Sequence, residues 1–146
     1  MNERITEDLI QSILKKKDYF SNDFIVEKQT SKSKKVNELL KTASKKGTQK
    51  KGFPEFIIQS EKYPGYLIVF EAKADIKKHQ SDKLNKPVEY AVDGAIHYGK
   101  NLSKQFNVIA VAASGQKQSN LEVSNFFFKK GSKEYTEITK KDKKPL

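Results

Sequence analysis

Residues 66–74 spell YLIVFEAKA, an apolar run that ends in charged side chains and predicts a buried β-strand. Because successive side chains of a strand point to opposite faces, Leu67 and Val69 share one face with Glu71 and Lys73. The intervening side chains are also apolar, which indicates a strand that is covered on both faces near the centre of a sheet. A glutamate and a lysine at the end of such a strand are costly to desolvate unless a site uses them.

A second strand precedes this run, in the sequence PEFIIQS at residues 54–60. The linking residues EKYPG contain a Pro-Gly turn signal, so we expect the two strands to form an antiparallel hairpin. Glu55 would then lie roughly opposite the Glu71 end, with Lys73 reaching the same space. Two converging carboxylates suit Mg²⁺, and a neighbouring lysine can orient the attacking water and stabilise charge growing on phosphorus. The alternative is a Glu71–Lys73 ion pair at a strand end, with Glu55 as an exposed turn residue.

The rest of the chain supplies helices and further strands around the hairpin. Apolar periodicity predicts a helix over residues 3–17, a short strand near 24–26 and a second helix with apolar positions 36, 39, 40 and 43, which Gly47 would end. After a polar loop at 75–86, Pro87 begins a third helix over about 87–103, and strands follow at 107–114 and 123–128. The order α-β-α-β-β-α-β-β predicts an α/β fold with a central mixed β-sheet flanked by helices.

The composition bounds the domain count and the partners. The 146 residues are enough for one domain, which we expect over residues 1–139 with a Lys-rich tail or linker at 140–146. The formal net charge of +11 would attract polyanions such as nucleic acid, although a solvated Lys-rich surface has the same composition. There is no cysteine, which excludes disulfides and thiolate metal sites. Neither a long apolar run nor a signal-peptide pattern is present, so we expect a cytoplasmic protein with no membrane partner.

The hairpin and the third helix together resemble the PD-(D/E)XK nuclease family. The segments that carry the resemblance are GFPEFII at 52–58, LIVFEAKAD at 67–75 and EYAVDGAIHY at 89–98. The chain is most similar to the N-terminal endonuclease domain of type I and type IIG restriction–modification enzymes, over roughly residues 6–115. This resemblance implies a restriction-endonuclease-like core and a DNA endonuclease that uses Mg²⁺, with Mn²⁺ as a substitute.

The resemblance implies a role for each residue of the hairpin pattern. Glu55 matches the family's aspartate metal ligand, with a longer side chain; Glu71 matches its second acidic ligand and Lys73 its catalytic lysine. The backbone carbonyl of Ala72 would be a further metal ligand. Many members add a glutamate from the first helix, for which Glu7 is the best match here. Glu7 could equally be an ordinary acidic residue that complements the helix N-terminus.

Two segments are candidates for DNA contacts. The loop at 77–80 could contact phosphates or be an ordinary solvated loop, and its residues are Lys77, Lys78, His79 and Gln80. In related nucleases the third helix carries a Gln and a Tyr near the scissile phosphate. This chain does not reproduce that pair; its candidates on the helix are Tyr90, Asp93, His97 and Tyr98. Asp93 and His97, four residues apart, could also form a simple surface pair.

The resemblance also implies partners. Type I and type IIG relatives join this domain to methyltransferase and specificity regions, and type I adds a motor. Neither a DPPY-type methyltransferase motif nor a G-x-x-x-x-G-K-[ST] loop occurs in the sequence, so we expect a fragment of a larger polypeptide or a stand-alone subunit. Two other functions stay open: a nuclease-like module that binds DNA without cutting it, and a stand-alone repair or junction-resolving nuclease. The complete Glu55, Glu71 and Lys73 set argues against the first.

Overall fold

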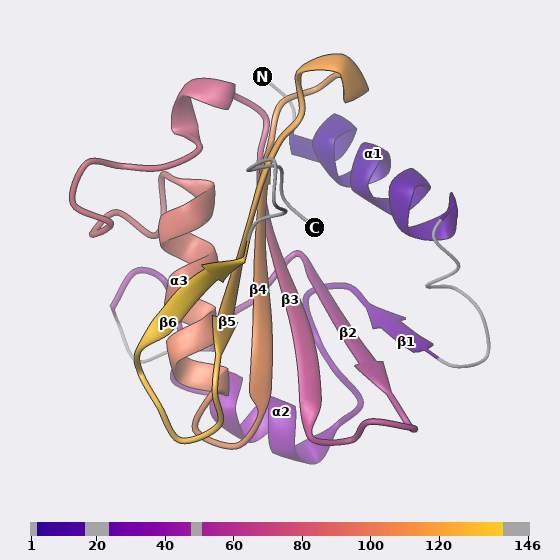
Figure 1. Cartoon of the computed structure of the whole chain (residues 1–146), viewed down its shortest axis with the longest axis vertical. Coiled ribbons are helices and arrows are strands. Elements are labelled where there is room, and N and C mark those ends of the chain that lie inside the picture. Colours follow the sequence, from indigo (N-terminus) through magenta and orange to yellow (C-terminus); the bar gives the residue numbers. More distant parts are fainter. Residues whose placement is uncertain (1–2, 17–23, 48–50, 139–146) are drawn as a thin grey trace.

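The computed structural model describes residues 3–16, 24–47 and 51–138. Within these residues, three α-helices pack against one open six-stranded sheet (Figure 1), and two short 3-10 helices lie at Ile76–Lys78 and Gln118–Asn120. The helices are α1 (Glu3–Lys16), α2 (Lys34–Leu40) and α3 (Ala91–Leu102). The strands are β1 (Phe24–Glu27), β2 (Phe56–Ser60), β3 (Tyr66–Lys73), β4 (Asn107–Ser114), β5 (Glu122–Phe128) and β6 (Tyr135–Ile138). The expected α/β class is therefore confirmed.

The sheet is mixed, and its strands follow one another in chain order from β1 to β6. All neighbouring strands are antiparallel except β3 and β4, which are parallel. Parallel neighbours need a crossover connection, and α3 supplies it. β3 is thus a central strand, as its apolar sequence indicates. The terminal strand β6 was not expected from the sequence, and the expected tail at 140–146 lies outside the described residues.

Each face of the sheet has its own hydrophobic core. On one face, Leu67 and Val69 of β3 pack with residues of α2 and α3 such as Leu40 and Val92. On the other face, residues of β2 and β3 pack against Ile10 and Leu14 of α1. Figure 1 shows α1 on one side of the sheet and α3 on the opposite side. The predicted alternation of side chains along β3 is confirmed.

The start of α3 differs from the sequence expectation. The helix begins at Ala91, and residues 87–89 form a turn instead of its first turn. Tyr90 has an extended backbone (φ −120°, ψ 140°), and the Val92 amide donates to the carbonyl of His79 at 2.7 Å. Proline favours a helix N-terminus, which is why the sequence predicts a start at Pro87. The contact with the preceding loop instead satisfies an amide in the first turn of a helix that begins at Ala91.

The end of α2 also differs. The helix stops at Leu40, well before Gly47, although Gly47 does have a positive φ of 71°. The carbonyl of Leu40 accepts from the amide of Ala43 at 3.1 Å and from that of Gly52 at 2.8 Å. Because the loop closes back onto the helix end, Ala43 is buried beyond the helix rather than on it. This loop leads from α2 to β2 and brings Lys45 toward the centre of the sheet.

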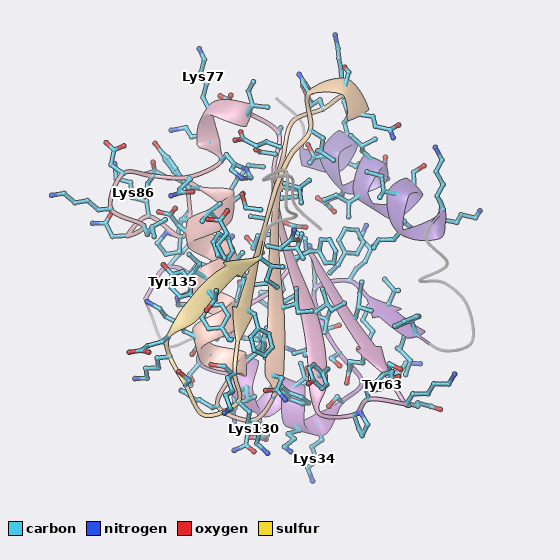
Figure 2. All side chains as sticks on the ribbon, in the orientation of Figure 1. Lys34, Tyr63, Lys77, Lys86, Lys130 and Tyr135 are labelled. Atoms are coloured by element: carbon cyan, nitrogen blue, oxygen red, sulfur yellow. The ribbon has the colours of Figure 1, made fainter. Side chains whose placement is uncertain are left out.

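The basic side chains are spread over the molecule. Figure 2 shows Lys77 and Lys86 projecting near one end of the sheet, and Lys34 and Lys130 projecting at the other. All four are exposed: Lys34 lies in the 7-residue α2, Lys77 in a short 3-10 helix (Ile76–Lys78), and Lys86 and Lys130 in loops or turns. The net charge therefore gives a field around much of the surface and does not by itself mark one binding face.

Candidate functional site

Glu55 and Glu71 are held next to each other at one end of the hairpin. The last ladder pair of β2 and β3 is Phe56 with Phe70. Glu55 lies at a bend just before β2, and its amide donates to the carbonyl of Phe70 at 3.0 Å. The same amide lies close enough to Glu71 to favour its ionised carboxylate. Oε2 of Glu55 is itself shielded from solvent.

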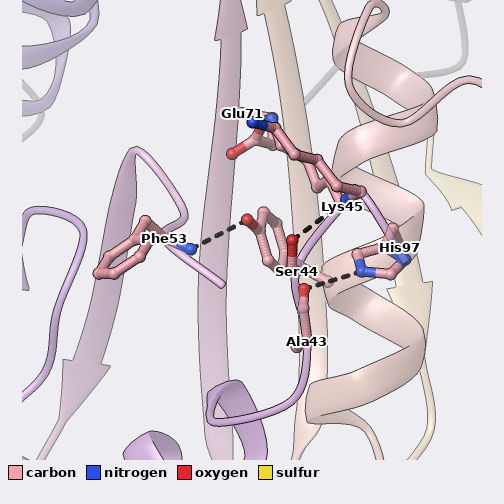
Figure 3. A network of polar contacts seen from close by, with 8 residues as sticks. Ala43, Ser44, Lys45, Phe53, Glu71 and His97 are labelled. Carbon is pink, nitrogen blue, oxygen red and sulfur yellow. Dashed lines mark hydrogen bonds and ion pairs between the residues drawn. The ribbon is translucent and has the colours of Figure 1, made fainter. Parts of the chain in front are cut away.

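Glu71 is fully buried, with 0% relative exposure, on the face of β3 that α3 covers. Its Oε2 accepts from Nζ of Lys45 at 2.5 Å, and Figure 3 shows the two side chains together. Its Oε1 is buried and accepts no hydrogen bond. Burial raises the pKa of Glu71 above its ordinary value of 4.5, while Lys45, Lys73 and the Glu55 amide act in the opposite direction. Glu71 thus has one oxygen bound to a cation and one oxygen available to a ligand.

Lys73 is a fourth charged group in the described part of the site. It is the last residue of β3, is half-buried, and its ammonium charge acts on the Glu71 carboxylate. With both carboxylates ionised, Glu55 and Glu71 contribute −2, and Lys45 and Lys73 contribute +2. The four side chains therefore sum to zero formal charge.

The carbonyl of Ala72 is directed toward the same end of the hairpin. The carbonyl of Lys73 accepts from the Gly115 amide beyond β4, at 3.0 Å. Backbone groups alternate sides along a strand, so the carbonyl of Ala72 points to the β2 side. The ladder with β2 has already ended there, and the next residue along that strand, Pro54, has no N–H to donate. The role of Ala72 as a backbone ligand stays a prediction.

Helix α3 forms the floor of the site. Tyr98 is buried, and its hydroxyl oxygen accepts from the amide of Phe53 at 3.0 Å (Figure 3). Burial raises the pKa of Tyr98, and the negative charges of Glu71 and Glu55 raise it further, so its hydroxyl stays protonated at neutral pH. A Cβ on Gly94 would stand 3.0 Å from Oε2 of Glu71. Because Gly94 has no side chain, α3 has room at this position for the Glu71 carboxylate.

The sequence pattern does not distinguish Lys45 from its neighbouring lysines. It belongs to the run of lysines before Gly52, where the pattern indicates only a basic loop. The contact with Glu71 depends on the path of the loop between α2 and β2, which packs against α3. A Cβ on Gly94 would also stand 3.2 Å from Cδ of Lys45, so the lysine stem runs between α3 and β3.

Glu7 does not join the carboxylate pair. It lies on α1, which packs on the face of the sheet opposite α3, and its Oε1 is 3.6 Å from Nζ of Lys28. Nowhere in the described ranges do three or more His, Cys, Asp or Glu side chains form a group that could hold an ion. A divalent ion at this site would thus take Glu55, Glu71 and the Ala72 carbonyl as protein ligands, with water for the rest of its shell.

His79 is buried and hydrogen-bonded inside the protein, whereas the sequence predicts an exposed loop position. It is buried, with ring nitrogens 2.7 Å from Oγ of Ser114 and 2.8 Å from Oγ of Ser124. Both ring nitrogens are therefore used inside the protein. Burial also lowers the pKa of His79, which favours its neutral form, and the charges of Glu122 and Glu137 partly oppose this.

Asp93 and His97 do not form the surface pair that their spacing allows. Asp93 is buried and accepts from the amide of Ser81 at 3.1 Å, from the amide of Lys86 at 2.9 Å and from the Ser81 hydroxyl. His97 instead donates from Nε2 to the carbonyl of Ala43 at 2.9 Å. Both side chains tie α3 to a loop, Asp93 to the loop before the helix and His97 to the loop that carries Lys45.

The other candidates for DNA contact are more accessible. Lys77 and Gln80 are exposed, while Lys78 and Tyr90 are partly buried. Nζ of Lys78 lies 5.0 Å from the ring centre of Tyr90 and 3.9 Å from Oε2 of Glu89. These four candidates remain predictions for phosphate contact.

Comparisons with known proteins leave the chain without a family assignment. No family model matches it, and neither a curated protein nor a solved structure matches it. Among the described helices, none is long and apolar enough to cross a membrane.

Proposed function

We propose that this chain is the Mg²⁺-dependent DNA endonuclease domain of a restriction–modification enzyme, and that it has the restriction-endonuclease-like core. The observation that carries the proposal is the environment of Glu71. Its carboxylate is fully buried, one oxygen accepts no hydrogen bond, and a second glutamate and two lysines lie beside it. A buried oxygen of this kind is costly unless it binds a cation, and carboxylate oxygens are the ligands that Mg²⁺ prefers.

Each residue of the site has a distinct role in this proposal. Glu55, Glu71 and the carbonyl of Ala72 would hold Mg²⁺, with Mn²⁺ as a substitute; the bound ion would act as a Lewis acid on a phosphodiester. Lys73 would orient the attacking water and stabilise the negative charge that develops on the phosphate. Tyr98 would keep the segment before Glu55 in place through its hydrogen bond with the Phe53 amide.

The substrate and partners follow from the same resemblance. DNA would be held through its phosphates by exposed groups such as Lys77 and Gln80, which read no base sequence. Selection of the cleavage site would then come from methyltransferase and specificity regions, and a motor where one is present, in a larger polypeptide or complex. The cytoplasm would be the natural location for such an enzyme.

A second candidate is a nuclease-like module that binds DNA without cutting it. The ion pair between Lys45 and Glu71 favours this candidate, because it already neutralises the buried carboxylate without a metal ion. In that case the four charges would form a structural cluster, and divalent ions would have no effect on the protein.

Nicking of supercoiled plasmid with Mg²⁺ or Mn²⁺ tests the proposal. The parent chain is compared with Lys73→Ala and with Lys34→Ala, a matched control because Lys34 is exposed at the other end of the sheet (Figure 2). We expect Lys73→Ala to abolish cleavage, with its melting temperature and DNA binding almost unchanged, and Lys34→Ala to cut like the parent. Equal cleavage by the parent and Lys73→Ala would refute the catalytic assignment. A parent chain that binds DNA but cuts with neither ion would establish the second candidate.

A further inference from the structure

Lys45 lies on a loop whose backbone is fastened to α3 on both sides of it. Before Lys45, the carbonyl of Ala43 accepts from His97 at 2.9 Å. After it, the amide of Phe53 donates to the Tyr98 hydroxyl at 3.0 Å (Figure 3). These anchors hold the described residues on either side of Lys45 against α3. The four-carbon side chain of Lys45 can still change rotamer, so its ammonium is the movable part of the site.

The Lys45 ammonium stands beside the position from which a divalent ion would bind Glu71. Nζ lies 2.5 Å from Oε2, and the only other oxygen of that carboxylate, Oε1, is buried beside it. An ammonium and a metal ion on the same carboxylate would be a few ångströms apart, and like charges at that distance repel strongly in a partly buried site. The Lys45 side chain is 19% exposed whereas that of Glu71 is 1% exposed, so the lysine is the partner that can move toward solvent.

The charge balance of the cluster leads to the same conclusion. Among these four described side chains, Lys45 offsets one of the two carboxylate charges, so its removal would leave them with a net charge of −1 toward a divalent ion. We infer that Lys45 is an internal counter-ion of Glu71, which weakens divalent-ion binding in the DNA-free protein and leaves the carboxylate when the ion binds. This inference rests on the proposed function, because the ion is the one that the nuclease site would hold.

The released ammonium has a defined use. Phosphate oxygens carry the negative charge that would next enter the site, and a lysine near the ion can bind them as a point charge. Lys45 would thus exchange a carboxylate oxygen for a phosphate oxygen. Binding of the ion and binding of DNA would strengthen each other.

Calorimetric titration of Mn²⁺ into the whole 146-residue chain without DNA tests this inference. Lys45→Met removes the ammonium and keeps a long side chain, and Lys45→Arg keeps the positive charge. Lys46→Met is the matched control, because it removes the same charge from the neighbouring, exposed lysine. Measurements at pH 8.5 favour an ionised Glu71 in every variant. We expect Lys45→Met to bind Mn²⁺ at least tenfold more tightly than the parent, and Lys45→Arg and Lys46→Met to stay within about threefold of it.

Unchanged or weaker Mn²⁺ binding by Lys45→Met, with the circular dichroism of the parent, would overturn the inference. An equal gain in Lys46→Met would do so too, because it would show a general charge effect. If Lys45→Met does not fold, Lys45→Gln is judged by the same criterion. If the parent binds Mn²⁺, Glu71→Gln loses that binding and Lys45→Met does not strengthen it, only the role of Lys45 is refuted. Absence of Mn²⁺ binding in the parent and in the Lys45 variants refutes the proposed function as well.

Discussion

Replacing Glu71 with glutamine should make the metal-free protein more stable at neutral pH, although the same change removes a proposed metal ligand. Burial raises the pKa of Glu71, and the nearby positive charges of Lys45 and Lys73 do not bring it back to 4.5. The folded protein therefore holds this proton more tightly than the unfolded chain does. Because the unfolded chain loses the proton first, the free energy of unfolding falls as the pH rises from 4.5 through the folded-state pKa.

The size of the effect follows from what glutamine changes. The amide has nearly the shape of the carboxylate and still offers an oxygen to Lys45, but it carries no charge. The gain comes from the desolvation cost of the buried negative charge, which glutamine does not carry, and it should be about 1–3 kcal/mol. Lys45 is not left as a buried charge, because its side chain is 19% exposed and its ammonium can reach water. We therefore expect the free energy of unfolding of Glu71→Gln to exceed that of the parent by about 1–3 kcal/mol at pH 8.

Urea denaturation between pH 4 and pH 8 measures this difference. Glu61→Gln, in the exposed hairpin turn, is the control for a change of net charge. The gap between Glu71→Gln and the parent should be small at pH 4 and should widen above pH 4.5. Added Mn²⁺ should stabilise the parent but not Glu71→Gln, because only the parent keeps both carboxylate ligands. A Glu71→Gln protein that is less stable than the parent throughout this range would show that the Lys45 pair outweighs the cost of burial.

Two further predictions concern the supports of the site. His79→Ala should lower the free energy of unfolding by about 1–3 kcal/mol in urea denaturation, because it leaves a fully buried serine hydroxyl without its partner. Burial lowers the pKa of His79, so the free energy of unfolding of the parent should also decrease as the pH falls below 6.5. The same dependence of stability on pH in His79→Ala would show that His79 does not cause this loss. Gly94→Ala should weaken Mn²⁺ binding, since its Cβ would stand 2.9 Å from a backbone oxygen and 3.0 Å from Glu71. Gly99→Ala, whose Cβ would clash with a core ring away from the carboxylates, should cost about 1–3 kcal/mol of stability but keep Mn²⁺ affinity; equal affinity losses in both variants would refute a local role for Gly94.

The strands and the position of Glu71 could be predicted because they depend on local periodicity. β4 covers the predicted residues 107–114, and β3 ends at Lys73, one residue before the end of the predicted run. The alternation that placed Glu71 on the same face as Leu67 and Val69 holds because any two-sided strand has that period. The Pro-Gly turn predicts the hairpin of β2 and β3, and the antiparallel pairing brings Glu55 next to the end of β3.

Lys45 could not be predicted in this way. Its partner is 26 positions away in the sequence, and the contact requires a loop that closes on the end of α2 and is then fastened to α3. Neither Lys45 nor Gly94 has a local pattern that separates it from other lysines and glycines. Only the packing of α3 on β3 shows that Gly94 leaves space that the Lys45 side chain fills.

The polar residues of the third helix and the preceding loop illustrate a related limit. Asp93 and His79 were expected at the surface, since charged and polar side chains are mostly exposed. Both are buried because partners from distant segments satisfy them: Ser81 for Asp93, and Ser114 with Ser124 for His79. Residue type alone does not reveal such partners.

These buried contacts determine what surrounds the carboxylates. Ser114 is the parallel partner of Lys73 in the sheet, so the hydrogen bond from His79 holds the 75–80 loop beside the end of β3. Asp93 holds the other end of the same connection to α3. The exposed Lys77 is consequently carried by a loop that is fixed at both ends next to the four charged side chains. His79 and Asp93 thus hold the connection that carries Lys77, which stays a predicted DNA contact.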